Sequence, residues 1–414
     1  MHPAQACSLW ISSLLLMAPG ALASPVGDPP PLPVEVRLQP GKGLRVARPD
    51  GQMALQIGLR AQFLYSYVHA PDDDGGRSSS QSGQIRRARL SFVGHTFGKH
   101  NKFKAEFAIS PRDIGMRGEN PIINREAQPT RSPLLDWYLH LDHLRDLTVR
   151  IGQYKLPFSR QRVISSGKLQ FVDRSIVNRE FNIDRDIGFD LRSENFLGLD
   201  RLRYAVGLYT GEGHSSFAQS DFGMLYLARI EYLPFGMFDD YSESDLKHWH
   251  SPKLSLGLAY SHLAEGKGSR GILGAPFEDG GTIDNDTITA DLMFKWRGWS
   301  VLWEGFARAG ERNHGGALDE QGQLMEIAPT RDGLGWMIQA GYMITPQGLE
   351  VAGRYSEIHG DDESSLSDQR EAGGAISYYF DGHPFKVQAD YLRLYARKIS
   401  EGTHQVRVQL QAAF

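Results

Sequence analysis

The stretch "HQVRVQLQAAF", residues 404–414, closes the chain on an alternating pattern. Apolar residues occupy every second position, at Val406, Val408, Leu410, Ala412 and Phe414. Because successive strand side chains point to opposite faces, the stretch predicts a strand with one apolar and one polar face. A chain that stops on such a strand needs a neighbour that pairs with it, since an open strand edge exposes unpaired backbone groups.

The same period of two recurs through most of the chain. Residues 55–67, 87–92, 102–109, 135–142 and 147–152 alternate in this way, as do many later segments. We count about sixteen such segments, each close to the ~9 to 11 residues with which a tilted strand crosses a bilayer. The pattern predicts an all-β protein, a transmembrane antiparallel β-barrel whose first and last strands pair.

Connection lengths support the barrel independently. Tight turns are expected after residues 97, 142, 196, 297, 345 and 381, and they alternate with long connections at 69–83, 111–133, 156–185, 264–283 and 311–332. Short periplasmic turns and long external loops are typical of outer-membrane barrels. Residues 234–251 break this rhythm, because a short turn is expected there and the pattern offers no reason for the insertion.

Composition and the N-terminus limit the other classes. The chain has 414 residues, a formal net charge of -4 and one cysteine, Cys7, so neither a disulfide framework, a multi-cysteine metal site nor nucleic-acid binding is indicated. The apolar stretch before "ALA" predicts a signal peptide at 1–23. A proline-rich, extended, periplasmic lead-in is expected at 24–52, and the barrel is expected at 53–414.

Three segments resemble the phosphate-selective porin O and P family. They are "IRRARLSFVGHTFGKHNKFKAEF" (85–107), "LLDWYLHLDHLRDLTVRIGQYKLPFSRQ" (134–161) and "LQFVDRSIVNREFNIDRDIGFDL" (169–191). The resemblance implies a sixteen-stranded barrel, a homotrimer and a narrow anion-conducting pore. Bacterial outer-membrane barrels also resemble one another in ending on Phe, which implies that Phe414 is the signal read by the barrel assembly machinery.

Basic residues on the polar face are the candidate pore lining. Arginine suits oxyanions because its planar fork donates two hydrogen bonds and stays charged. The predicted anion-binding set is Arg60, Arg87, Arg89, Lys102, Lys104, Arg150 and Arg192. Of the adjacent pair Arg86 and Arg87, only Arg87 is expected to face the pore unless a bulge intervenes. The alternative interpretation is that Glu106, Asp136, Asp142 and Asp190, on the same face, neutralise these cations.

The long connection from Leu156 to Arg185 is the candidate constriction. Its basic residues Lys168, Arg174 and Arg185 would narrow an anion path if it folds into the bore. The alternative is an external loop whose charges are solvated.

The prediction is therefore an outer-membrane porin that conducts small solutes passively, chiefly anions such as phosphate or other oxyanions. Its expected partners are small anionic solutes and outer-membrane lipid, and no cofactor, metal or catalytic residue is expected. "GEGHSS" (211–216) lacks the G-x-S-x-G of a serine hydrolase, and the histidines lack a ligand framework. Two alternatives stay open: a weakly selective general porin of the same fold, and a secreted soluble all-β binding protein or enzyme.

Overall fold

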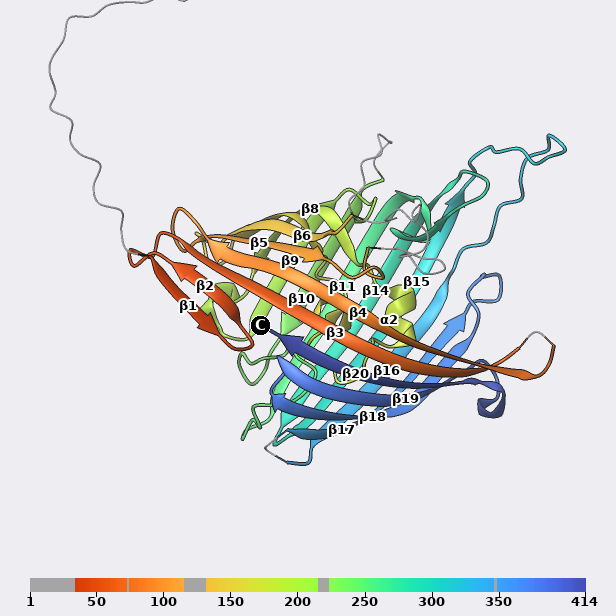
Figure 1. Cartoon of the computed structure of the whole chain (residues 1–414). Helices are drawn as coiled ribbons and strands as arrows, with labels where there is room; N and C mark the ends of the chain where they lie inside the picture. Colours follow the sequence, from red (N-terminus) through yellow and green to blue (C-terminus); the bar gives the residue numbers. More distant parts are fainter. Residues whose placement is uncertain (1–33, 73, 115–131, 215–222, 346–347) are drawn as a thin grey trace, which may run out of the picture. The chain divides into compact units, whose positions relative to one another are not determined.

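A computed structural model describes residues 34–72, 74–114, 132–214, 223–345 and 348–414. Within residues 34–414, sixteen antiparallel strands close into a barrel (Figure 1), as the alternating pattern predicts. The barrel strands are β3 (Ala54–Pro71), β4 (Arg77–His95), β5 (Asn101–Ala108), β6 (Leu134–Leu141), β7 (Thr148–Lys155), β8 (Arg185–Ser193), β9 (Leu202–Tyr209), β10 (Leu225–Tyr232), β11 (Lys253–Gly266), β14 (Thr282–Trp296), β15 (Trp299–Asn313), β16 (Gly333–Met343), β17 (Leu349–Gly360), β18 (Gln369–Asp381), β19 (Phe385–Tyr395) and β20 (Thr403–Ala413).

A few short elements complete the described part. They are β1 (Glu35–Gln39), β2 (Gly43–Ala47), β12 (Gly268–Arg270), β13 (Leu273–Pro276), the helices α1 (Arg160–Val163) and α2 (Ile176–Phe181), and the 3₁₀ turns η1 (Phe196–Gly198) and η2 (Ile399–Glu401). Among the described residues, no helix has the length and apolar character needed to cross a bilayer.

The last strand closes the barrel. β20 pairs with β19 on one side and with β3 on the other, in a register that places Leu410 opposite Phe63. The final residue continues the pairing, because the Phe414 backbone N–H donates to the Leu59 carbonyl at 2.8 Å and the Leu59 N–H donates back at 3.0 Å. Closure satisfies backbone groups that lipid would leave unpaired, which explains why the chain can end on a strand.

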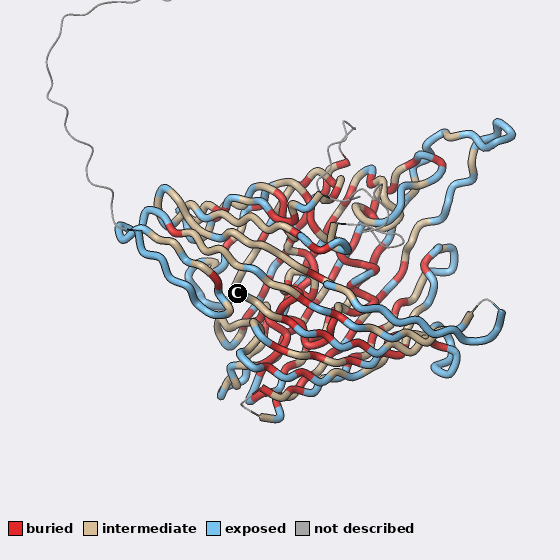
Figure 2. The backbone as a smooth tube through the Cα atoms, in the orientation of Figure 1, coloured by how far each residue is buried: buried red, intermediate tan, exposed pale blue. Residues whose placement is uncertain are grey.

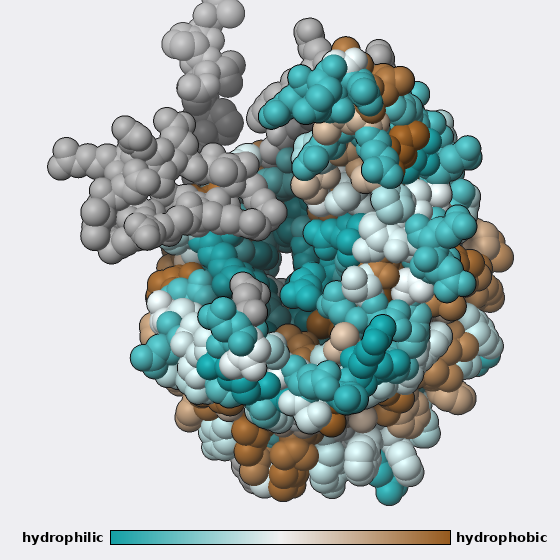
Figure 3. All heavy atoms as spheres, turned by 90° about the vertical axis from the view of Figure 1, so that its right-hand side faces the viewer, coloured by the Kyte–Doolittle hydropathy of each residue, from teal (hydrophilic) through white to brown (hydrophobic). Residues whose placement is uncertain are grey.

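Alternation separates the two faces of the wall. In β20, Val408 and Leu410 are about two-fifths exposed on the outside, whereas Gln409 and Gln411 are 1% exposed on the inside. Figure 2 shows the buried residues gathered in the middle of the strands, and Figure 3 shows hydrophobic residues on the outer circumference around a hydrophilic central hollow. A greasy exterior and a polar interior are the arrangement that a bilayer requires.

Aromatic residues mark the rim that carries the short turns. Trp296 and Trp299 flank the β14–β15 turn, and Tyr378 and Phe380 precede the β18–β19 turn, all pointing outward. Tyr379 is 3% exposed and points inward because it lies between two outward residues. Indole and phenol rings favour the membrane–water boundary, so the outward set indicates where lipid ends.

The lead-in contains more structure than an extended segment. β1 and β2 form an antiparallel hairpin, and β2 pairs with the first residues of β3, from Ala54 to Ile57. The hairpin therefore extends the sheet beyond the point where β20 stops. The expected signal peptide at 1–23, and the start of the lead-in, lie outside the described residues.

Candidate pore and constriction

The connection after β7 folds into the bore. Residues 156–184, called the inward loop below, contain α1 and α2, whose first turns are capped by Ser159 and Ser175. Leu156, Phe158 and Ile164 are 0% exposed, although a loop outside the barrel would be solvated. The sequence left two interpretations open, a loop folded into the bore and an external loop. The structure shows the loop folded into the bore.

Apolar side chains of the inward loop pack against one part of the lumen wall. Phe181 stacks on Phe306 of β15 with ring centroids 5.7 Å apart, and Phe158 lies 6.2 Å from the same ring. The buried cluster takes further members from the loop and from β10 to β17: Ile164, Leu169, Ile176, Val177, Leu225, Leu227, Ala259, Leu263, Met293, Leu302, Met337 and Ile358. The inner face of β10–β17, called the packed wall below, thus forms a hydrophobic core with the loop rather than a water channel.

Buried ion pairs fix the loop to the same wall. Arg160 of α1 is 0% exposed, and its guanidinium contacts Asp291 at 2.5 Å, Asp240 at 2.7 Å and Glu231 at 3.2 Å. Arg229 adds a second cation to the cluster through Asp291, at 2.6 Å. A buried charge is tolerated only when it is paired and hydrogen-bonded, so this cluster specifies where the loop sits.

The insertion that the strand rhythm left unexplained enters the bore from the opposite end. Residues 233–252, called the inserted turn below, bury Asp240, Glu243 and Ser244. Glu243 accepts hydrogen bonds from Gln161 and from the Gln170 backbone of the inward loop, at 3.2 and 2.7 Å. The two intrusions therefore hold each other. Burial raises the pKa of the Asp245 carboxyl, which accepts from the backbone N–H of Gly298.

Basic side chains line the inner face of β3–β8, called the charged wall below. Arg87 contacts Asp173 of the inward loop at 2.5 Å, and Arg86 contacts the same carboxylate at 3.2 Å. The exception that the sequence prediction allowed applies here: the β3–β4 register shifts between Gln62 and Phe63, so β4 bulges at Arg86 and both neighbours contact Asp173.

Most of the predicted cations are paired with carboxylates. Arg89 contacts Glu106 and Asp113, both at 3.0 Å. The others pair as Lys104 with Asp136 at 2.6 Å, Lys102 with Asp142 at 2.5 Å near the short-turn rim, and Arg192 with Asp190. These four, like Arg87, fit the alternative interpretation of cross-strand neutralisation.

Two predicted cations have a different environment. The Arg60 guanidinium donates to the hydroxyls of Ser165 and Ser166 at 2.9 and 3.1 Å. Arg150 lies 4.6 Å from the Tyr138 ring centroid and donates to His140. Within the described residues, neither has a carboxylate within 4.0 Å, so each adds a positive charge that no ion pair neutralises.

The three constriction candidates occupy different places. Arg185 opens β8 and pairs with Asp136 at 2.5 Å, so it belongs to the wall. Arg174 donates to backbone carbonyls of the loop, at Gln161 and Ile164, and stabilises its shape. Lys168 is about two-fifths exposed, and its Nζ lies 3.7 Å from Asp239 of the inserted turn. Of the three, Lys168 stands where the two intrusions meet.

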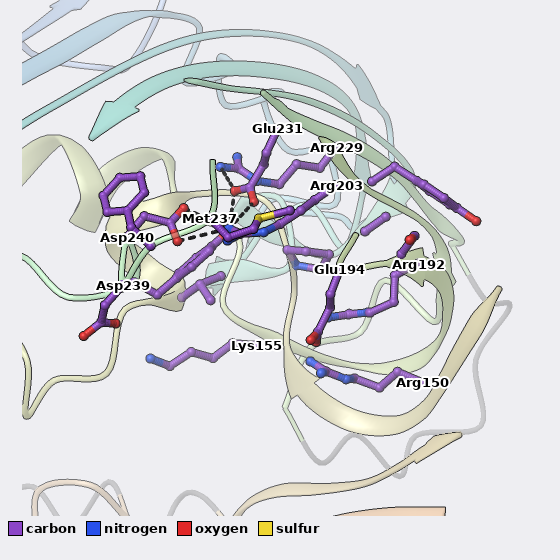
Figure 4. A pocket seen from close by; sticks show the side chains of 17 residues that line it. Arg150, Lys155, Arg192, Glu194, Arg203, Arg229, Glu231, Met237, Asp239 and Asp240 are labelled. Atoms are coloured by element: carbon purple, nitrogen blue, oxygen red, sulfur yellow. Dashed lines mark hydrogen bonds and ion pairs between the residues drawn. The ribbon is translucent and has the colours of Figure 1, made fainter. Parts of the chain in front are cut away.

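A cavity of about 470 Å³ lies between β7–β10, the inward loop and the inserted turn. Figure 4 shows Arg150 and Lys155 on one side of it and Glu231, Met237 and Asp240 on the other. The sequence pattern did not indicate this cavity or Lys155, because Met237 and Asp240 come from the insertion that the pattern could not place.

A profile of the phosphate-selective porin O and P family matches residues 55–414. The chain belongs to this family. It is an outer-membrane porin of bacteria, and the fold and family are those of channel proteins.

Known proteins agree with the porin fold at low identity. An uncharacterized protein of Aquifex aeolicus (strain VF5) is 22% identical over 396 residues, covering 88% of each chain. An anion-selective porin from Comamonas acidovorans has a TM-score of 0.54 and 15% identity, over 87% of this chain and all of that one. The trimer form of OmpT from Vibrio cholerae has a TM-score of 0.52 and 10% identity, over 87% of this chain and 99% of that one.

The family fixes the orientation of this porin. Its short turns, at the end where β20 finishes, are periplasmic, and its long loops are external. The inward loop therefore reaches the bore from outside the cell, and the inserted turn reaches it from the periplasm. Within the described residues, no group of three or more His, Cys, Asp or Glu could hold a metal ion.

Proposed function

We propose that this porin conducts small solutes passively and favours anions, including phosphate and other oxyanions. The observation that supports it is the uneven pairing on the charged wall. Glu106, Asp136 and Asp190 each contact at least one cation. Arg60 and Arg150 have no carboxylate within 4.0 Å among the described residues, which leaves positive charge in excess along the open side of the bore.

Fixed charge in a narrow, polar bore selects ions by replacing part of their hydration and repelling ions of the same sign. The guanidinium forks of Arg60 and Arg150 would bind passing oxyanions briefly, and a path that holds ions weakly lets them leave. Arg87, Arg89, Lys102, Lys104 and Arg192 would act less directly, since each shares its charge with a carboxylate. Lys168, Arg174 and Arg185 would add positive potential at the constriction.

The second candidate is a weakly selective porin of the same fold. The pairing of Arg87 with Asp173 and of Arg89 with Glu106 favours it, because a neutralised wall attracts neither ion strongly. In both candidates the bore passes solutes by diffusion along the charged wall.

Reversal potential in a potassium chloride gradient separates the two. We expect the wild-type channel, purified and inserted in a planar bilayer, to reverse near the chloride equilibrium potential. Arg60→Gln and Arg150→Gln should each move the reversal potential toward zero. Arg145→Gln, which alters an exposed arginine of a periplasmic turn, is the matched control and should change nothing. A wild-type channel that reverses near zero would favour the weakly selective porin, and one near the potassium potential would exclude both.

We also propose that three copies assemble into a homotrimer, as OmpT of Vibrio cholerae does in its trimer form. The apolar outer face of the barrel would supply the contact. Light scattering of the protein in mild detergent should give three times the mass of one chain. A monomeric mass that persists across detergents would contradict this.

The two ends of the chain would act in export and assembly of the barrel. Residues 1–23 would be removed as a signal peptide, and Phe414 would present the end of β20 to the barrel assembly machinery. Phe414 is 62% exposed on the outside of the barrel, where its ring adds little to packing. Phe414→Ser, which removes the ring and keeps the backbone pairing with Leu59, should therefore reduce the amount of heat-modifiable barrel in the outer membrane much more than it reduces the stability of barrel that has folded. Equal losses in both would contradict an assembly role.

A further inference from the structure

The cavity beside Arg150 combines two kinds of surface. Its cationic side carries Arg150, Lys155 and Arg192, from β7 and β8 (Figure 4). Its other lining includes apolar side chains from the two intrusions: Pro157, Val163, Met237 and Phe238. A bore that served only hydrated ions would gain nothing from hydrocarbon at this place, because an ion leaves its water only for polar groups.

Of the three cations on this side, Arg192 pairs with Asp190, whereas Arg150 and Lys155 are held in place by other contacts. Arg150 lies between the rings of Tyr138 and Tyr154, at 4.6 and 5.5 Å, and its Nη2 lies 3.2 Å from His140 Nδ1. Lys155 Nζ donates to two loop carbonyls, of Arg162 and Ile164, at 2.8 and 3.4 Å. Within the described residues, neither cation has a carboxylate within 4.0 Å; the ammonium of Lys155 is directed at the loop carbonyls, so Arg150 is the cation that can receive a solute.

On the opposite side of the cavity, the arginines are neutralised by carboxylates. Arg203 contacts Asp240 at 2.9 Å and Glu231 at 3.2 Å, and Arg229 contacts Glu231 at 2.7 Å. Two further carboxylates line the cavity, Glu194 beside Arg192 and Asp239, which lies 3.7 Å from Lys168; within the described residues neither is within 4.0 Å of Arg150. The unpaired positive charge is therefore at Arg150, and the hydrocarbon of Met237 faces it across the cavity. The two surfaces match a solute that has an anionic end and an apolar body.

Solute size and hydration decide between ligand classes. A volume of about 470 Å³ lies within the range of roughly 300 to 1,000 Å³ that is usual for small-molecule sites. Inorganic phosphate is polar on every side, so contact with Val163 and Met237 would cost it water without return. An aromatic carboxylate can place its carboxylate on Arg150 and its ring on the apolar side chains.

We propose that this cavity is a subsite for small aromatic carboxylates, which pause there on their way through the pore. The proposal rests on the proposed anion path and specifies its solute. It also gives the inserted turn a role, since that segment supplies Met237 and Phe238 and completes the cavity that β7–β10 leave open.

The affinity of the subsite can be measured as block of the chloride current by a solute that binds there. The full-length protein is inserted in planar bilayers in potassium chloride, and benzoate, acetate or inorganic phosphate is added to both sides at equal ionic strength. We expect benzoate to reach half-block at a concentration about tenfold lower than acetate or phosphate, because only benzoate buries an apolar ring. Half-block by phosphate at the same or a lower concentration than benzoate would overturn the proposal.

Substitutions on the two surfaces distinguish the contribution of the positive charge to block from that of the apolar contacts. Met237→Gln and Val163→Thr keep size and charge but remove apolar contact, so benzoate half-block should rise about threefold or more while acetate block and reversal potential stay unchanged. Met53→Gln, on an exposed residue before β3, is the matched control. Arg150→Gln should weaken block by benzoate and acetate alike. Benzoate block that is unaffected by Met237→Gln and Val163→Thr would overturn the subsite.

The same recordings test the anion-selective pore and the aromatic-carboxylate subsite separately. A cation-selective wild-type channel removes the proposed function and the subsite with it. An anion-selective channel in which benzoate blocks no better than acetate removes the subsite alone. The Met237 and Val163 variants can be scored even if Arg150→Gln fails to fold, and heat-modifiable migration on a denaturing gel identifies the folded variants.

Discussion

The packed wall and the charged wall use the same charged residue types for different roles. On the packed wall, Arg160 and Asp291 are wholly buried and serve as the connection between loop and barrel. On the charged wall, Lys104 is about one-quarter exposed, as is Asp173 of the inward loop, which contacts that wall, and both face the remaining water path. The difference shows that a guanidinium or carboxylate in a porin lumen is not by itself a conduction site; its burial decides between a structural and a conducting role.

Breaking the ion cluster of the packed wall should have the largest effect. Arg160→Ala leaves Asp291, Asp240 and Glu231 buried with fewer cations, and we expect a loss of about 3–5 kcal/mol in the free energy of unfolding. The inward loop should also loosen, so single-channel conductance should rise. Urea titration in lipid vesicles and bilayer recordings measure the two quantities.

The matched control lies two residues away in α1. Arg162 pairs with Asp184, and both side chains are 22% exposed. Arg162→Ala should therefore change stability by about 1 kcal/mol or less. Similar losses for Arg160→Ala and Arg162→Ala would show that the two sides of the loop do not differ as burial indicates.

Removing hydrocarbon from the packed wall should come next. Ile164 is 0% exposed within the cluster that joins the loop to the wall. Ile164→Ala should cost about 2–4 kcal/mol, because it loses buried area and leaves a cavity. Ile399→Ala, on a residue 57% exposed in η2, should stay within about 0.5 kcal/mol. A small loss at Ile164 would mean that the loop is held by its polar contacts alone.

On the charged wall, a change should alter selectivity more than stability. Asp173→Asn removes the negative charge shared by Arg86, Arg87 and Arg407, which lie at 3.2, 2.5 and 3.6 Å. We expect a loss of about 1–3 kcal/mol in the free energy of unfolding and a reversal potential closer to that of chloride. Asp50→Asn, which alters an exposed pair with Arg48 before β3, is the control and should leave the reversal potential unchanged. A shift toward the potassium potential would contradict an anion path along this wall.

The strand order and the closing pair were predictable because a closed barrel repeats one local rule. Val408 and Gln409 differ in hydropathy and lie on opposite faces, and the same alternation labels every strand. The hairpin of β1 and β2 could also have been found, since Val36 and Leu38 alternate with charged residues before the "PGKG" turn at 40–43.

The site was less predictable because its partners are distant in sequence. Arg160 meets Asp291 across 131 positions, and a solvated loop would contain the same arginine. The inserted turn reads as polar and irregular, so Asp240 and Glu243 gave no sign of burial. The inward position of Arg86 could be stated only as an exception, since a bulge changes the face of one residue without changing the composition of its strand.

The smallest effect on stability is expected at the contact between the inward loop and the inserted turn. Lys168 and Asp239 are 42% and 36% exposed, with Nζ and Oδ1 3.7 Å apart, so the pair should add about 1 kcal/mol or less to stability. Lys168→Gln should therefore leave the urea midpoint unchanged, yet it removes a solvated cation at the junction of loop and turn, so the chloride conductance should fall at low salt and recover at high salt, where screening weakens the field of the ammonium. Lys398→Gln, in an exposed pair with Glu401, is the matched control and should alter neither quantity. If Lys168→Gln instead lowered the urea midpoint with no change in conductance at any salt concentration, Lys168 would belong with Arg160 as a connection between segments, and the path for solutes would have to run elsewhere along the charged wall.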